Sequence, residues 1–381
     1  MEIIIKRDYL VSSLQKIQYI LEKTSALQYS HNILIKTADN MAFIIAFDID
    51  CSAKATLPIT MKEAGTICVN GKKLFEIIRS LDDENVVLQK KDDENLITIK
   101  GHKSFFHILS AKWEDFPVID FNPPDDYFTI KAEILKKLIE RTVFSIARIS
   151  DPRYNLEGIY VEVNPENIEK ENEDEQENNI LTFVSTDGHR VSVAKTDKID
   201  GSINLGDSRL FSRKSLMEIK NVFSDEEKLK ISFTGNDVYV IGETFIMILR
   251  MLKGNFPDYR KMIPENFTHE IKLKRDKFLQ ILKRMNVLAY DKYKGIIMSF
   301  NENRLTININ NPEMGNAQED MIISFTGEPF TVSFNISYLL DFIQVSTAEE
   351  IDMYISGGMQ PCIFKEKGND NYINGVMPMK S

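Results

Sequence analysis

The run Ile130-Lys131-Ala132-Glu133-Ile134-Leu135 passes from a short β-like segment into an amphipathic helix, and it has a counterpart toward each end of the chain. The counterparts are Ile5-Lys6-Arg7-Asp8-Tyr9-Leu10 and Ile271-Lys272-Leu273-Lys274-Arg275-Asp276, which gives spacings of 125 and then 141 residues. The sequence therefore predicts three equivalent units in a line.

Two further markers recur in the same order. The first is Leu74-Phe75-Glu76-Ile77, Leu216-Met217-Glu218-Ile219 and Leu339-Leu340-Asp341-Phe342, and the second is Asp115-Phe116-Pro117, Asn255-Phe256-Pro257 and Val376-Met377-Pro378. A chain of 381 residues is long enough for about three domains. We predict domains at residues 1–124, 125–259 and 260–381, the second enlarged by an acidic insert at 165–179.

Each unit is expected to begin with a strand and a helix, cross several short strands, enter a second helix and finish in a β meander. Many short strands with only two helices per unit indicate an α+β fold, in which the helices pack on antiparallel sheet. The predicted meander strands are 86–90, 96–100 and 104–109 in the first unit, 229–234, 238–242 and 244–251 in the second, and 350–355, 361–366 and 371–377 in the third.

The composition is that of an ordinary globular protein, with 43% hydrophobic and 27% charged residues. Because Glu2 and Lys6 interrupt the first apolar residues, we expect no signal peptide, and no apolar stretch is long enough to span a membrane. Cys51, Cys68 and Cys362 are too widely spaced for a metal cluster or a disulfide framework. We therefore predict a cytoplasmic protein without a metal or other cofactor.

The net charge of −10 is unevenly distributed. Of six predicted helical segments, all but the last are net positive, and the rest of the chain is strongly acidic; the segments are 6–21, 70–81, 131–148, 209–222, 272–284 and 335–345. Helix surfaces tolerate Lys and Arg in general, which is the simpler explanation. The alternative is a basic surface of repeated helices that binds phosphate without regard to sequence, inside an acidic exterior that repels it.

Motifs of known enzyme classes are absent: the chain has no Gly-rich phosphate loop, HExxH or GxSxG. The run Ser185-Thr186-Asp187-Gly188-His189-Arg190 could present Asp187 and His189 as acid–base groups, but Asp-Gly is also a common tight turn between strands. A hydrolase or transferase using these two residues, and a monomeric module that wraps around nucleic acid, stay open as alternatives.

Several motifs in the same order resemble the bacterial DNA polymerase III β subunit family, the sliding clamps. They are Thr186-Asp187-Gly188-His189-Arg190, Asn255-Phe256-Pro257-Asp258-Tyr259-Arg260, Ile309-Asn310-Asn311-Pro312-Glu313, Phe334-Asn335-Ile336-Ser337-Tyr338 and Val376-Met377-Pro378-Met379-Lys380. The resemblance covers the whole chain. It implies three similarly folded domains per subunit, closed head to tail into a homodimeric ring around double-stranded DNA, and a non-catalytic role in processivity.

The resemblance also implies three sets of site residues. Sequence-independent DNA contacts are expected at Lys23, Lys137, Arg141, Arg148, Arg153, Tyr154, Lys214, Lys277 and Arg284. A pocket for a short apolar peptide of the replicative polymerase, the ATP-dependent clamp loader, and repair and translesion polymerases is expected at Leu156, Thr186, Gly188, His189, Arg190, Val191, Pro257, Lys261, Met262, Asn335, Tyr338, Met359, Pro361, Val376, Met377, Pro378, Met379 and Lys380. The dimer interface is expected at Lys103, Phe106, Ile108, Val287, Leu288, Tyr293, Glu313 and Glu319, with Lys103 facing Glu313 or Glu319.

The chain departs from the family pattern at a few of these places. Val191, Lys261, Met262 and Gly375 stand where relatives often carry other apolar or basic residues, which changes the expected shape of the pocket. The run Met314-Gly315-Asn316-Ala317 is less acidic than in many relatives, and this weakens the expected ion pairing across the dimer interface.

Overall fold

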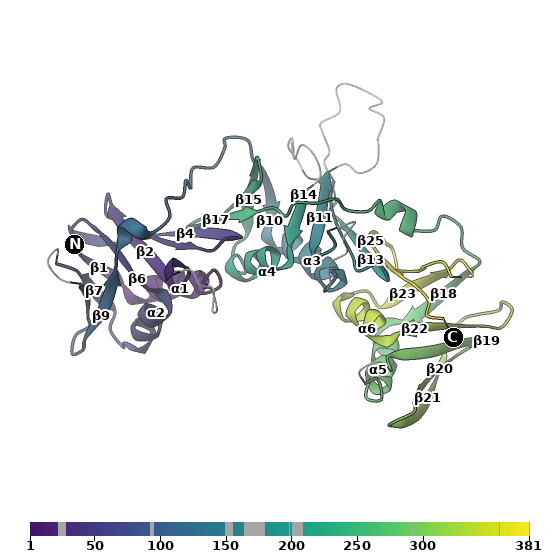
Figure 1. Ribbon diagram of the computed structural model, residues 1–381. Coiled ribbons are helices and arrows are strands. Elements are labelled where there is room, and N and C mark those ends of the chain that lie inside the picture. Colours follow the sequence, from purple (N-terminus) through teal and green to yellow (C-terminus); the bar gives the residue numbers. More distant parts are fainter. Residues whose placement is uncertain are drawn as a thin grey trace, which may run out of the picture. The chain divides into compact units, whose positions relative to one another are not determined.

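The computed structural model describes residues 1–21, 28–91, 95–148, 155–163, 180–197, 199, 209–290, 293–357 and 359–380. The chain divides into two compact units. Figure 1 labels their helices and strands. Unit 1 is formed mainly by Met1–Leu135 and Lys214–Met251, and unit 2 mainly by Lys136–Ile199 and Leu252–Ser381.

Unit 1 is built on one antiparallel sheet of 13 strands, in the order β10-β15-β16-β17-β4-β3-β2-β6-β9-β8-β7-β1-β5. Its strands are β1 (Glu2–Lys6), β2 (Asn32–Ala38), β3 (Met41–Phe47), β4 (Cys51–Pro58), β5 (Thr60–Glu63), β6 (Thr66–Asn70), β7 (Asn85–Gln89), β8 (Leu96–Lys100), β9 (Phe105–Ala111), β10 (Phe128–Lys131), β15 (Lys228–Thr234), β16 (Asp237–Ile241) and β17 (Phe245–Arg250). The pairing of β4 with β17 joins strands of the predicted first and second domains into one hydrogen-bonded sheet.

Unit 2 contains an eight-stranded sheet in the order β14-β11-β12-β13-β25-β24-β23-β18 and a four-stranded sheet in the order β21-β20-β19-β22. The strands are β11 (Gly158–Val163), β12 (Leu181–Thr186), β13 (Arg190–Lys195), β14 (Arg209–Ser212), β18 (His269–Lys274), β19 (Gly295–Asn301), β20 (Arg304–Asn311), β21 (Gly315–Ile322), β22 (Phe330–Asn335), β23 (Glu350–Ile355), β24 (Cys362–Glu366) and β25 (Asn369–Val376). Here β13 pairs with β25, which again joins strands of two neighbouring repeats.

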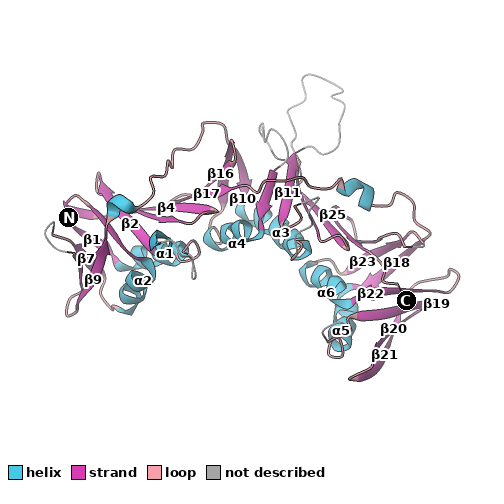
Figure 2. Cartoon of the chain, in the orientation of Figure 1, coloured by secondary structure: helices cyan, strands magenta, loops and turns pink. Residues whose placement is uncertain are grey.

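Among the residues that the structure describes, six α-helices pack on the sheets (Figure 2). They are α1 (Arg7–Ile17), α2 (Gly71–Ser80), α3 (Ala132–Thr142), α4 (Arg213–Val222), α5 (Arg275–Met285) and α6 (Ile336–Val345), and the 3₁₀ turns are η1 (Gln28–His31), η2 (Trp113–Asp115), η3 (Val143–Ser145) and η4 (Tyr259–Met262). Each helix buries one apolar stripe: α1 buries Leu10, Leu14 and Ile17, and α5 buries Phe278, Ile281, Leu282 and Met285. The α+β fold with helices on antiparallel sheet is thus confirmed.

The predicted meander strands match β7–β9, β15–β17 and β23–β25 closely, but the predicted helical segments were too long. Lys6, Lys131, Arg209, Lys272 and Lys274 belong to strands that lead into the helices rather than to the helices. The residue before a helix keeps extended backbone angles, as at Lys6 (ψ 123°) and Lys274 (ψ 111°). The positive charge of the helices themselves is therefore smaller than the sequence segments suggested.

Helix α3 ends earlier than the predicted segment 131–148. The α-helix stops at Thr142, whose hydroxyl donates a hydrogen bond to the Leu138 carbonyl at 2.7 Å, and the chain continues into η3. Phe144 lies in η3, so its side chain does not follow the basic face of α3. None of the helices among the described residues has the length and apolar character that a membrane span requires.

Candidate functional site

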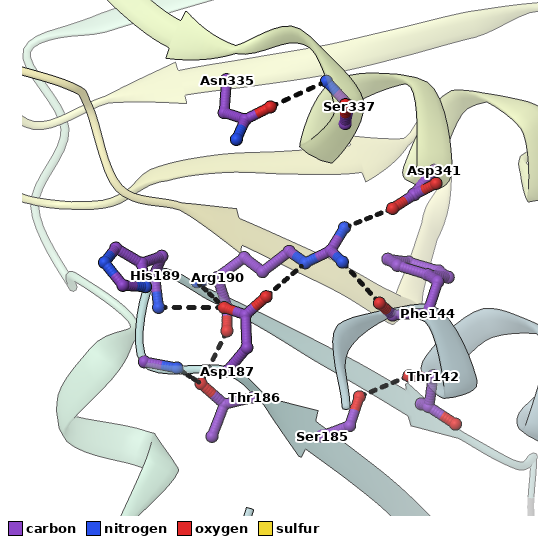
Figure 3. A network of polar contacts seen from close by, with 11 residues as sticks. Thr142, Phe144, Ser185, Thr186, Asp187, His189, Arg190, Asn335, Ser337 and Asp341 are labelled. Carbon is purple, nitrogen blue, oxygen red and sulfur yellow. Dashed lines mark hydrogen bonds and ion pairs between the residues drawn. The ribbon is translucent and has the colours of Figure 1, made fainter. Parts of the chain in front are cut away.

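The turn between β12 and β13, Asp187-Gly188-His189, is held by its own side chains (Figure 3). The Asp187 carboxylate accepts hydrogen bonds from the backbone N–H groups of His189 (3.0 Å) and Arg190 (3.1 Å). The Thr186 hydroxyl donates to the Arg190 carbonyl at 2.6 Å and accepts from the Gly188 N–H at 3.1 Å. Gly188 has φ +84°, a conformation that glycine adopts without steric cost. This Asp-Gly turn is therefore a rigid structural element.

The Arg190 guanidinium joins this turn to two helical elements of unit 2. Nε donates to Asp187 at 3.0 Å, Nη1 to Asp341 of α6 at 2.6 Å, and Nη2 to the backbone carbonyl of Phe144 in η3 (Figure 3). The guanidinium also lies over the Tyr338 ring at 4.3 Å and the Phe144 ring at 5.4 Å. Because a planar guanidinium can bind carboxylates and stack on aromatic rings at once, a lysine could not replace it here.

The predicted peptide-pocket residues at the end of β25 meet this turn. Val376 pairs with Arg190 and Gly375 with Val191 in the β13–β25 ladder. The Met377 N–H donates to the His189 carbonyl at 2.8 Å, and the Met379 N–H donates to the Ser333 carbonyl of β22 at 2.8 Å. The chain from 376 to 380 thus runs from the turn to the four-stranded sheet.

Apolar side chains gather beside the same ladder. Val191 is buried with Val184, Val193 and Tyr259, and the half-buried Met262 packs against them. A side chain at position 375 would meet Val191 at 2.9 Å, so Gly375 allows β25 to approach β13 closely. The methionines at 359 and 379, both predicted to line the pocket, are 48% and 40% exposed and so present adaptable apolar surface.

Other predicted pocket residues have structural roles or lie apart from the turn. The Asn335 side chain caps α6 by accepting a hydrogen bond from the Ser337 N–H at 3.0 Å. Lys261 is exposed beside Asp258 at 3.4 Å. Pro361 lies 3.8 Å from the Cβ position of Gly375. Leu156 is buried, Pro257 and Pro378 are half-buried, and Lys380 is exposed.

Three residues outside the predicted peptide pocket hold Arg190 in place: Asp187, Asp341 and Phe144. The sequence could have indicated the role of Asp341, because an acid among the apolar helix residues Leu339-Leu340-Asp341-Phe342 needs a polar partner. Its counterpart Glu218 in the second repeat occupies the same place in the marker.

The residues predicted to contact DNA differ in their surroundings. Arg141, Lys214 and Arg284 form ion pairs within the chain, with Glu366 (2.6 Å), Asp48 and Glu319 respectively. Lys137, Arg148 and Lys277 are exposed. Lys23, Arg153 and Tyr154, like the insert at 165–179, lie outside the described residues. The Arg141 guanidinium also stacks on Tyr372 at 4.6 Å, and its contact with DNA stays a prediction.

The ion pair of Lys214 lies beside a buried carboxyl group in unit 1. Asp48 and Glu218 are 2% and 5% exposed, and the Oε2 atom of Glu218 has no hydrogen-bond partner among the described residues. Burial raises the pKa of Glu218 to about 7, although the nearby Lys214 charge opposes the change. Burial and the neighbouring Glu218 carboxylate also raise the pKa of the Cys51 thiol.

The predicted interface residues lie next to open strand edges. Along β9, Phe106 and Ile108 are half-buried, whereas Phe105 and Leu109 are 65% and 77% exposed. β9 pairs with β8 along its length but with β6 only near Ala111. In unit 2, β21 is the edge of its sheet, and Ile322 on it is 80% exposed.

The remaining interface predictions lie near β21. Val287 is exposed, and Leu288 and Tyr293 are half-buried. Glu313 is exposed, while Glu319 is held by Arg284 of the same chain, with Nε of Arg284 2.9 Å from its carboxylate. Lys103 is exposed in unit 1, and its expected pairing with Glu313 or Glu319 stays a prediction.

Three family models match consecutive parts of the chain. They describe the N-terminal, central and C-terminal domains of the DNA polymerase III beta subunit and match residues 1–120, 129–258 and 260–380. Beta sliding clamps of Proteus mirabilis and Pseudomonas putida are 29% and 27% identical to this chain, with all of both chains covered.

Solved structures agree with these matches. The sliding clamp of Pseudomonas aeruginosa bound to griselimycin has a TM-score of 0.89 and 26% identity, with all of both chains covered. The Caulobacter crescentus clamp has a TM-score of 0.90 at 23% identity, over all of this chain and 99% of that one, which shows the same fold.

The fold therefore defines a three-domain DNA clamp without catalytic machinery. The chain belongs to the bacterial DNA polymerase III beta subunit family, the sliding clamps, and its function is that of a non-catalytic processivity factor in DNA replication. The alternative of a hydrolase using Asp187 and His189 is excluded by this membership, and both residues serve the turn beside Arg190.

Replacing Arg190 tests whether the guanidinium holds the turn, η3 and α6 together. Arg190→Ala leaves Asp187 and Asp341 without their shared cation, and we expect a loss of about 2–3 kcal/mol in the free energy of unfolding, less than for a fully buried pair because Asp341 is partly exposed. Urea unfolding followed by circular dichroism measures this. Arg304→Ala, which removes an exposed cation 3.8 Å from Asp320, should cost less than about 0.5 kcal/mol. Equal losses in the two variants would show that Arg190 has no such role.

The raised pKa of Glu218 predicts a pH dependence of stability. The folded state binds the proton more tightly than the unfolded state, so this contribution is complete below pH about 4.5 and is lost as the pH rises through about 7. The loss is at most about 3 kcal/mol, from 1.36 kcal/mol per pKa unit. Urea unfolding at pH 5, 6, 7 and 8 should show that the free energy of unfolding of the unsubstituted protein falls as the pH rises. The fall should be smaller in Glu218→Gln. It should be unchanged in Glu76→Gln, which alters an exposed side chain of α2. Parallel pH profiles for the native protein and Glu218→Gln would contradict the prediction.

Proposed function

We propose that two copies of the chain close head to tail into a ring that encircles double-stranded DNA, with domains at 1–124, 125–259 and 260–381. Membership of the sliding-clamp family supports this arrangement, because a clamp that holds DNA by topology needs a closed path. A two-fold dimer that pairs the first domain of each chain with the third domain of its partner leaves no unpaired end.

The proposed dimer interface forms between β9 of one chain and β21 of its partner. Among the described strands β21 has one neighbour only, and β9 pairs with β6 only near Ala111. The two strands carry the exposed apolar side chains Ile322 and Leu109 respectively. Open strand edges pair readily with another strand. The interface would bury Phe106, Ile108, Val287, Leu288 and Tyr293, with Lys103 and Glu313 at its rim.

The proposed DNA contacts are weak and independent of sequence. Lys137, Arg148 and Lys277 are exposed and come from α3, the segment after it and α5, which supports direct phosphate contact. The electrostatic potential that attracts DNA would include a contribution from the ion-paired residues Arg141, Lys214 and Arg284. Lys23, Arg153 and Tyr154 complete the proposed set.

The proposed protein-docking site takes a short apolar peptide from the replicative polymerase, the clamp loader or repair polymerases. The Arg190-centred turn gives it a rigid floor, and Val191, Met262, Met377, Pro378 and Met379 give it an adaptable apolar wall. The observation that carries this proposal is the hydrogen bond from Met377 to His189, which brings the two predicted halves of the pocket together.

A closed ring should stay on circular DNA even when its contacts with the phosphates are weak, which a protein bound by affinity alone would not do. We expect a solution mass of twice 43.9 kDa by light scattering, and protein loaded on a nicked circular plasmid should remain bound in 1 M salt, which abolishes most phosphate contacts. Cutting the plasmid once should release it. The double variant Leu109→Asp, Ile322→Asp should be monomeric and unable to stay on circles. Equal retention on circular and linear DNA in high salt would contradict the ring and favour a wrapping module.

The docking site is tested separately with a fluorescent pentapeptide composed of Leu, Phe and Gln. Met377→Ala combined with Met379→Ala should weaken its binding by about tenfold or more, because these side chains form the pocket wall. Met314→Ala, which shortens an exposed methionine on the β20–β21 turn, is the matched control and should leave the affinity unchanged. Fluorescence anisotropy measures both. Unchanged binding in the double variant would place the peptide elsewhere.

A further inference from the structure

The proposed docking turn in unit 2 has a structural counterpart in unit 1. The turn Asp48-Ile49-Asp50 joins β3 to β4 as Asp187-Gly188-His189 joins β12 to β13. The Arg250 N–H donates to the Asp50 carbonyl at 2.9 Å, which matches the 2.8 Å hydrogen bond from Met377 to His189. Leu249 pairs with Cys51 as Val376 pairs with Arg190. The two turns therefore hold the same position relative to the last strand of the following repeat.

The second helix of the second and third repeats shows the same correspondence between the two units. Glu218 of α4 and Asp341 of α6 occupy the same position in Leu216-Met217-Glu218-Ile219 and Leu339-Leu340-Asp341-Phe342. In unit 2 Asp341 binds Arg190, whereas in unit 1 the residue equivalent to Arg190 is Cys51. The cation in unit 1 comes instead from the helix, where Lys214 binds Asp48. The turn in unit 1 thus has no cation of its own.

The turn in unit 1 borders a cavity of about 250 Å³. Four aspartates line it, Asp48, Asp50, Asp120 and Asp237, against a single cation, Arg250. Asp48 is neutralised by Lys214, and Arg250 is 3.7 Å from Asp237 with most of its side chain in solvent. Asp50 has no ion-pair partner among the residues that the structure describes. The cavity is therefore acidic at the place where unit 2 presents His189 and Arg190.

Apolar side chains complete the lining. Ile49 is 57% exposed and Val118 fully exposed at its margin, and the Tyr239 ring closes one side with its hydroxyl donating to the Asp120 carbonyl at 3.3 Å. The volume is below the roughly 300–1,000 Å³ of sites for drug-sized molecules, so it suits one or two side chains. Among the described residues no group of His, Cys, Asp and Glu could hold a metal ion, which argues against a bare cation as the occupant.

We propose that this cavity is a second docking site, which binds a short peptide segment of a partner protein through a lysine or arginine next to an apolar side chain. The basic group would pair with Asp50 and Asp120, and the apolar group would contact Ile49 and Val118. We propose a basic segment because the aspartates of the cavity would attract it, whereas they would repel an acidic or phosphorylated segment. This proposal rests on the proposed docking function of unit 2, extends it to the counterpart in unit 1, and assigns the site in unit 1 a preference for a basic peptide.

The test compares two fluorescent pentapeptides, Leu-Lys-Phe-Lys-Leu and Leu-Glu-Phe-Glu-Leu, by fluorescence anisotropy on the full chain. We expect the lysine peptide to bind and the glutamate peptide to bind at least about tenfold more weakly to this site. Asp50→Asn combined with Asp120→Asn should weaken the lysine peptide by about tenfold, because both carboxylates lose their charge with little change in shape. Hydrogen exchange should show protection at residues 48–50 and 248–250 when the lysine peptide is added.

Control variants separate this site from the one in unit 2 and from general attraction to an acidic protein. Asp8→Asn removes an equally negative but 87% exposed side chain outside the cavity and should leave the affinity unchanged. Met377→Ala changes the proposed docking site in unit 2 and should also leave it unchanged. If Met377→Ala weakens the lysine peptide while the Asp50/Asp120 variant does not, the proposal is wrong and the docking function in unit 2 stands. Absence of binding, or an equal loss in Asp8→Asn, would also overturn it.

Discussion

Backbone hydrogen bonds between strands of neighbouring repeats are the constraint on which the rest of the structure depends. In unit 1 the last strand of the second repeat, β17, pairs with β4 of the first, and in unit 2 the last strand of the third repeat, β25, pairs with β13 of the second. Each ladder places a chain segment against the turn at the end of the neighbouring strand. Both proposed docking sites lie where such a ladder ends, so their position would follow from the sheet rather than from loop conformation.

The two ladders have the same backbone geometry but different side chains. In unit 2 one arginine satisfies two carboxylates, a carbonyl and two aromatic rings, and little of it is left to solvent. In unit 1 the equivalent residue is Cys51, whose thiol carries no positive charge to pair with Glu218. Burial of the Glu218 carboxyl group therefore raises its pKa to about 7. Cysteine in place of arginine at this position therefore leaves a buried, titratable carboxyl group in unit 1, whereas the equivalent carboxylate in unit 2 is paired with Arg190.

Much of the fold could be predicted from sequence because the signals were local and repeated. The meander strands followed from alternating apolar residues and turn residues, and the three helix-entry runs fixed the repeat. Helix starts were misplaced because a strand residue such as Lys274 and a helix residue such as Lys277 look alike in composition, and only the backbone angles separate them. The ion pairs of Arg141 and Lys214 could not be foreseen, since their partners Glu366 and Asp48 are distant in sequence. The family resemblance gave the predicted pocket residues, but not Asp341 or Phe144, which position Arg190.

The central place of β25 has a consequence for how unit 2 is made. The strand lies between β13 and β24, and the paired residues Arg190 and Val376 are 186 positions apart. During synthesis at about 5–20 residues per second, the free edge of β13 waits roughly ten to forty seconds for its neighbour. Contacts of such long range also slow folding. The nascent chain therefore carries an unsatisfied strand edge for about half of its synthesis, and during that time the edge is open to pairing with other strands.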